Sequence, residues 1–69
     1  MEKTIGKKLY ELRKQSGFTQ DFVAEKLGVS AQAVSKWEKG TTEPSTSNLF
    51  ALAKLFDMPI EEFMKEIQL

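Results

Sequence analysis

The side chains best suited to chemistry in this 69-residue chain are polar and lie between residues 30 and 39. Helical spacing places Val34 and Trp37, three residues apart, on one side of this segment. The other side carries Ala31, Gln32, Ser35, Lys36 and Lys39. Amide, hydroxyl and ammonium groups match the hydrogen-bonding edges of base pairs, so such a face can enter a major groove. The pattern indicates a binding surface.

Catalytic chemistry has little support. The chain has no cysteine and no histidine, which removes disulfides, Cys/His zinc sites, thiol nucleophiles and imidazole bases. Glu61, Glu62 and Glu66 suggest paired carboxylates or a magnesium site. They share a short segment with Lys65, and nothing nearby supplies a nucleophile or a closed pocket, so a solvated face is the better interpretation. We therefore expect no enzyme activity, no metal and no cofactor.

Short helices must position the polar face, and each helix has its own start and stop signals. Side chains that can cap a helix N-terminus stand at Thr4, Thr19, Ser30 and Ser45. Glycines at 17, 28 and 40 each follow one helical segment. Asp57-Met58-Pro59 ends the fourth helix, and a fifth is expected through Ile60, Phe63, Met64 and Ile67. The sequence therefore predicts an all-α, compact five-helix domain.

The second and third helices form a helix-turn-helix over about residues 19–39. Ala24 is small where the two helices approach each other, and Gly28 allows the turn between them. Val29, Val34 and Trp37 would lock the third helix onto the second. This packing leaves the polar side of the third helix facing outward.

Size and charge set further limits. Sixty-nine residues make one domain, 1–69, with a small core. The net charge is zero, but residues 1–56 carry nine basic and six acidic residues, whereas residues 57–69 carry one and four. The longest apolar run, residues 49–53, is too short to cross a membrane, and the start has no signal-peptide core. We expect a cytoplasmic protein without a membrane partner.

The chain resembles the Cro/phage-repressor helix-turn-helix family, also called the XRE family. The resemblance rests on the order and spacing of matching segments along nearly the whole chain. These segments are Ile5-Gly6, residues 9–13, 17–20, 23–24, 26–30, 34–40 and 44–45, Leu49, and residues 52–54. The resemblance implies a lambda-repressor-like fold and a transcription regulator that binds double-stranded DNA, with the third helix as the recognition helix.

The resemblance also implies roles for individual residues. Base edges would be contacted by Ala31, Gln32, Ser35 and Lys36. Gln32 suits adenine, Lys36 suits guanine, and the Ala31 methyl suits thymine. The DNA backbone would be contacted by Gln20, Ser30, Lys39, Thr41 and Thr42.

Other positions are expected to be structural. The resemblance implies that Arg13 and Glu38 form a structural ion pair joining the first helix to the end of the third, in place of a DNA or catalytic role. Two positions depart from the family pattern. Ala31 replaces a residue that is often long and polar, and Phe22 stands where the family usually has an outward polar residue. Phe22 would either fill a gap in the core or contact a partner.

Apolar residues near the C-terminus outnumber the needs of a small core. We expect some of them to be exposed and to form a homodimer interface. The candidates are Phe50, Leu55, Ile60, Met64 and Ile67. Such a dimer would bind a palindromic operator as a repressor. The alternative is a protein-interaction module, such as the antitoxin of a toxin–antitoxin pair, which the acidic C-terminal segment would suit.

Overall fold

The computed structural model describes residues 4–67 and contains five helices in that part of the chain. They are α1 (Ile5–Ser16), α2 (Gln20–Leu27), α3 (Ala31–Lys39), α4 (Thr46–Leu55) and α5 (Ile60–Met64). The predicted all-α five-helix fold is confirmed. None of the described helices is long and apolar enough to cross a membrane.

The predicted caps start the first four helices. The side-chain oxygens of Thr4, Thr19, Ser30 and Ser45 each accept a hydrogen bond from the backbone N–H three residues later, at 3.0–3.2 Å. Gly28 has a φ of 72°, in the left-handed region that glycine adopts without strain, and this conformation makes the turn from α2 into α3. Local signals in the sequence therefore set most of the helix boundaries.

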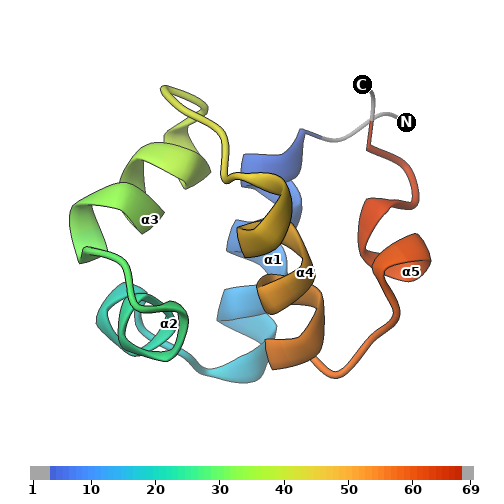
Figure 1. The fold of residues 1–69 in the computed structure, drawn as a ribbon, viewed down its shortest axis with the longest axis horizontal. Helices are drawn as coiled ribbons and strands as arrows, with labels where there is room; N and C mark the ends of the chain where they lie inside the picture. The colour runs from blue at the N-terminus through green and yellow to red at the C-terminus, as the bar shows by residue number, and fades with distance from the viewer. Residues whose placement is uncertain (1–3, 68–69) are drawn as a thin grey trace.

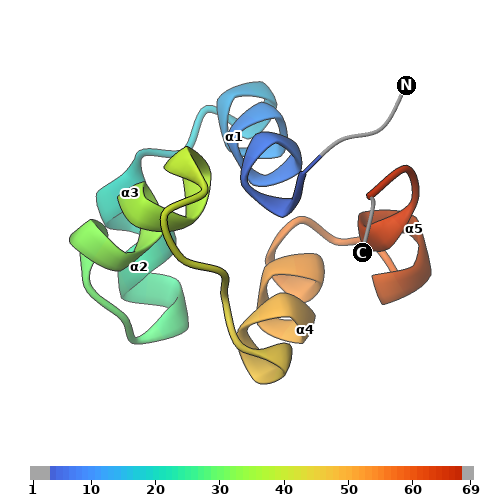
Figure 2. The same ribbon diagram turned by 90° about the horizontal axis from the view of Figure 1, so that it is seen from above.

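The helices surround one small core, to which each contributes a fully buried residue. These residues are Leu9, Val23, Val34, Leu52 and Phe63, in order from α1 to α5. The helices α2 and α3 lie on one side of α1 and α4, and α5 lies on the other (Figures 1 and 2). The helix-turn-helix and the C-terminal helix therefore occupy opposite ends of the molecule.

The expected extent of the fifth helix is wrong. The helix ends at Met64, because Lys65 adopts an extended conformation and Glu66 takes a φ of 73°. Ile67 follows this turn, donates its N–H to the Met64 carbonyl at 3.1 Å, and still packs against the core. The spacing of apolar residues fits a longer helix as well as such a turn, and so it does not locate the end.

Candidate nucleic-acid interface

The recognition-helix candidate, α3, has two distinct faces. Val34 is fully buried and Trp37 is 6% exposed. On the opposite side Gln32, Lys36 and Lys39 are exposed to solvent. Ala31 and Ser35 lie between the two faces and are half-buried, with Ala31 packed against the core. The amide and the two ammonium groups are thus free to meet a ligand, while the buried face holds the helix in place.

The remaining backbone-contact candidates flank α3. The Ser30 side chain is committed to capping α3, where it accepts from the Ala33 N–H at 3.0 Å. Thr41 and Thr42 are exposed in the loop after the helix. The Thr41 N–H bonds to the Lys36 carbonyl at 3.0 Å, which keeps this loop against the end of α3. Ser30 and the two threonines therefore stand at opposite ends of α3.

The packing of α1 against α3 depends on Gly6, which is buried in the first turn of α1. A Cβ atom at this position would press on the Trp37 carbonyl oxygen and lie 2.9 Å from that of Glu38. Real Cβ atoms stay at least 3.0 Å from such neighbours. Gly6 therefore lets the backbones of α1 and α3 approach more closely than any other residue would.

A buried carboxylate ties the elements around α3 together. Glu38 accepts hydrogen bonds from Arg13 Nε at 2.6 Å and Arg13 Nη2 at 3.1 Å. The side chains of Arg13 and Glu38 are only 10% and 6% exposed. The third guanidinium nitrogen, Nη1, donates to the Phe18 carbonyl at 2.9 Å. The expected pairing of Arg13 with Glu38 is therefore a two-pronged ion pair that also fastens the loop between α1 and α2.

The charge on Arg13 is stable against pH. The hydrogen bond to Glu38 raises the pKa of the Arg13 guanidinium above its ordinary value, and this effect outweighs the opposing effect of burial. A raised pKa contributes stability that is fully present below the unfolded-state pKa and is lost only as the pH rises through the folded-state pKa. Arg13 therefore stays charged throughout the neutral pH range.

The side chain of Gln20 is hydrogen-bonded within the protein, so it moves less freely than a glutamine that points into solvent. Its side-chain nitrogen Nε2 donates to Glu38 Oε1 at 2.9 Å, and the residue is half-buried. The carboxamide nitrogen carries a second hydrogen that this bond does not use. The sequence gives no sign of this bond, because its partners lie 18 residues apart and meet only when α2 packs on α3.

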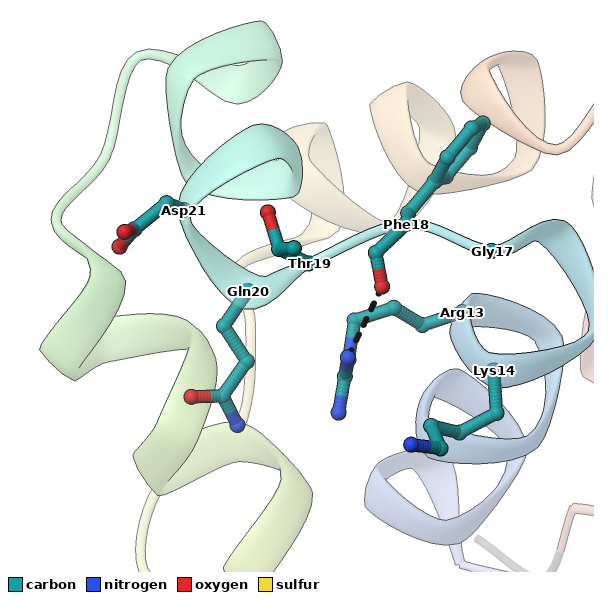
Figure 3. Close-up of a pocket in the computed structure, with 7 residues that line it drawn as sticks. All are labelled: Arg13, Lys14, Gly17, Phe18, Thr19, Gln20 and Asp21. Atoms are coloured by element: carbon teal, nitrogen blue, oxygen red, sulfur yellow. Dashed lines mark hydrogen bonds between the residues drawn. The ribbon is translucent and has the colours of Figure 1, made fainter.

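An open hollow lies beside this network, between the end of α1 and the start of α2. Its volume is about 650 Å³, and it is lined by Arg13, Lys14 and residues 17–21. Gln20 and Lys14 lie on either side of the Arg13 guanidinium (Figure 3). The sequence does not single out Lys14, because its residue type alone does not separate it from the other lysines.

The unusual Phe22 is half-buried and belongs to a row of aromatic rings. Its ring centroid lies 4.5 Å from that of Phe18, and Phe18 in turn stacks on Phe56 at 6.0 Å. Lys26 extends its ammonium over the outer side of the Phe22 ring, 5.4 Å from the centroid. This packing favours the first of the two expected roles, in which Phe22 fills a gap in the core. The row of rings joins the start of α2 to the end of α4.

The candidate dimer residues differ in exposure. Phe50 is 54% exposed and stands out from α4. Leu55, Ile60, Met64 and Ile67 are half-buried and pack against the core. Phe50 and Ile60 also line an open hollow of about 590 Å³ between α4 and the loop leading to α5. A large exposed ring beside an apolar hollow is therefore the most accessible part of this set.

Five short helices, with a glycine turn between the second and third and a polar outer face on the third, define a helix-turn-helix domain. The family model for helix-turn-helix proteins matches residues 9–63, and the chain belongs to this family.

Three known proteins show how far the likeness extends. The transcriptional regulator DicA of Escherichia coli is 44% identical over 52 residues, which are 75% of this chain and 38% of DicA. The transcriptional regulator MJ0272 of Methanocaldococcus jannaschii is 42% identical over 55 residues, covering 80% of this chain and 83% of that protein. The P22 c2 repressor, solved in complex with a synthetic operator, superposes with a TM-score of 0.82 at 31% identity, over 93% of this chain and 97% of the repressor.

The similarity covers less than half of the length of several relatives. The chain spans between 29% and 43% of the curated regulators BcrR, DicA, ImmR and PuuR.

Proposed function

We propose that the chain is a sequence-specific regulator of transcription that binds double-stranded DNA and acts as a repressor. The observation that carries the proposal is the division of α3 into a buried face at Val34 and Trp37 and an exposed polar face at Gln32 and Lys36. A helix held rigidly on one side can present its other side to a major groove without further ordering. The family membership and the operator complex of the P22 c2 repressor support this assignment.

The roles proposed for the residues of α3 depend on how exposed each side chain is. The base-reading side chains are Ala31, Gln32, Ser35 and Lys36, with Gln32 and Lys36 the most accessible. The residues proposed to hold the DNA backbone lie at the start of α2, at the two ends of α3 and in the loop after it. They are Gln20, Ser30, Lys39, Thr41 and Thr42. Backbone contacts set the register, and the base contacts select the sequence. Binding to the operator is sufficient for repression, so we propose no enzymatic role.

The neutral net charge shapes the expected affinity. Non-specific binding comes mainly from the attraction of cations to phosphates, so a neutral domain binds random DNA weakly. Specificity must then come from contacts local to α3. Because a protein that reads operators works where the DNA is, we also propose a cytoplasmic location.

The first experiment is the selection of bound sequences from random duplex DNA at two salt concentrations. We expect an enriched operator whose binding weakens as salt rises. Enrichment at neither salt would contradict the proposal and would favour the protein-interaction module.

Gln32→Ala tests the reading face directly. A good bidentate base contact is worth roughly 1–3 kcal/mol, so this variant should weaken the selected operator about 5- to 150-fold while leaving random duplex almost unchanged. The matched control is Gln15→Ala, also exposed. Gln15 lies nine residues after Gly6, about two and a half helical turns, on the side of α1 away from α3. An equal loss on operator and random DNA would remove Gln32 from the base readers.

We further propose a homodimer that binds a palindromic operator. The interface would use Phe50, Leu55, Ile60, Met64 and Ile67, with Phe50 at its accessible centre. Two recognition helices would then lie about 34 Å apart, the spacing of successive major grooves on one side of DNA. Sedimentation at micromolar concentration should detect the dimer, and the selected operator should be palindromic. A monomer that selects a single half-site would contradict this proposal.

A further inference from the structure

An aromatic ring and two cations lie together on the outer side of α1. Tyr10 is 47% exposed, one of the two large apolar side chains most open to solvent. The Arg13 guanidinium carbon lies 5.5 Å from the centre of its ring, and the Lys14 ammonium lies 6.0 Å from it. A ring face attracts cations within about 6 Å, so Tyr10 orients both side chains.

The two cations are not equivalent. Arg13 is buried, and its nitrogens are committed to Glu38 and to the Phe18 carbonyl. Lys14 is exposed, and within the described chain its ammonium lies over the Tyr10 ring rather than against a carboxylate. The charge of Lys14 is therefore available to an external anion, whereas that of Arg13 is not.

The hollow next to Lys14 places this charge near a residue that is bonded to the recognition helix. Lys14 lines it together with Thr19 and Gln20. Gln20 is hydrogen-bonded to Glu38 on α3, so one wall of the hollow is attached to α3, although no residue of α3 lines it. Figure 3 shows the side chains of Lys14 and Gln20 at its two sides. A DNA strand that reached Gln20 while α3 occupied the major groove would pass next to Lys14.

We propose that Lys14, oriented by the Tyr10 ring, is a further contact to the DNA sugar–phosphate backbone, made from α1. The proposal rests on the proposed DNA-binding function and extends its surface from α2 and α3 onto α1. A lysine acts on phosphate as a point charge, so its contribution is independent of base sequence. The ring restricts the flexible side chain of the lysine before DNA binds, so less conformational entropy is lost on binding.

The test measures how binding depends on salt. Log affinity falls as log salt concentration rises, and each phosphate neutralised by a lysine makes this negative slope steeper by about 0.9. Lys14→Gln should make the slope shallower by about 0.9. It should do so equally on the selected operator and on random duplex. Lys26→Gln is the matched control, because Lys26 is also exposed and lies over an aromatic ring, that of Phe22, but is outside this hollow. It should leave the slope unchanged.

The role of the ring is tested separately. Tyr10→Phe keeps the ring and should bind DNA as the parent does, whereas Tyr10→Leu should weaken binding by part of the Lys14→Gln loss. In a Lys14→Gln background, Tyr10→Leu should cause no additional loss of DNA binding. Unfolding in urea, monitored by Trp37 fluorescence, verifies that each variant is folded during the DNA measurement.

The outcomes separate the two proposals. If the parent protein binds operator but Lys14→Gln keeps the slope of the Lys26→Gln control, the α1 contact is wrong and the proposed function stands. If Tyr10→Leu weakens binding equally with and without Lys14, the ring does not act through the lysine. If the parent protein binds neither the operator nor random duplex, the proposed function fails and the α1 contact fails with it.

Discussion

Gly6→Ala tests the close approach of α1 and α3. The added Cβ would meet two carbonyl oxygens, those of Trp37 and Glu38, at distances that real Cβ atoms do not reach. Both obstacles are backbone atoms of α3, so no side chain can rotate to relieve them. The helices must separate by a few tenths of an ångström or more.

The magnitude follows from two opposing effects. Inserting a carbon into a packed contact typically costs about 1–3 kcal/mol of stability. Because the opposing atoms belong to the backbone of α3, which cannot rotate away, the cost here is about 3 kcal/mol. Alanine is a better helix former than glycine by about 1 kcal/mol. The expected net loss is about 2 kcal/mol, a large part of the stability of a small domain. For a domain of this size that loss lowers Tm by about 8–16 °C.

The assay uses Trp37, the single tryptophan, which is 6% exposed and touches the affected contact. Urea unfolding followed by its fluorescence gives the free energy of unfolding. Lys7→Ala is the control, since Lys7 is exposed on α1 next to Gly6 and should change stability by less than about 0.5 kcal/mol. A Gly6→Ala protein as stable as its parent, or more stable, would refute the close approach of the two backbones.

Two further predictions concern the buried pair and the dimer. Glu38→Ala leaves the buried guanidinium of Arg13 unpaired and should cost about 3–5 kcal/mol in urea unfolding, whereas the double change Arg13→Met with Glu38→Leu should cost clearly less; equal losses would mean that the unpaired charge is not the cause. Phe50→Ser should change monomer stability by less than about 0.5 kcal/mol but weaken self-association in sedimentation; an undiminished dimer would exclude Phe50 from the interface.

The sequence predicts the helix starts well because their signals are local. Each cap at Thr4, Thr19, Ser30 and Ser45 reaches only three residues along the chain, and the sequence displays that spacing directly. The end of α5 lacks such a signal. It depends on a left-handed Glu66, a conformation that non-glycine residues adopt only when the surrounding structure favours it.

Local patterns in the sequence do not predict most long-range contacts; the pairing of Arg13 with Glu38 is expected only from the family resemblance. Gly6 looks like an ordinary helix glycine, and only the structure shows that α3 lies against it. Gln20 looks like a solvated amide, and only the structure shows its hydrogen bond to α3. Lys14 lies one turn from an aromatic residue of its own helix, but the hollow beside it also needs the start of α2. In each case the role of the residue depends on a part of the chain beyond its own helix.

The two halves of the proposed site differ in how freely they can change. Glu38 holds Arg13 of α1 and Gln20 of α2 through one buried carboxylate, and Arg13 in turn holds the loop before α2. A substitution of Glu38 therefore alters the fold and the DNA surface together. The side chains of Gln32 and Lys36 face solvent one turn apart and form no hydrogen bond or ion pair with another described residue. Exposed positions of this kind change at little cost to stability. A domain built in this way can exchange its base readers, and with them its operator, while the buried network keeps α3 in place.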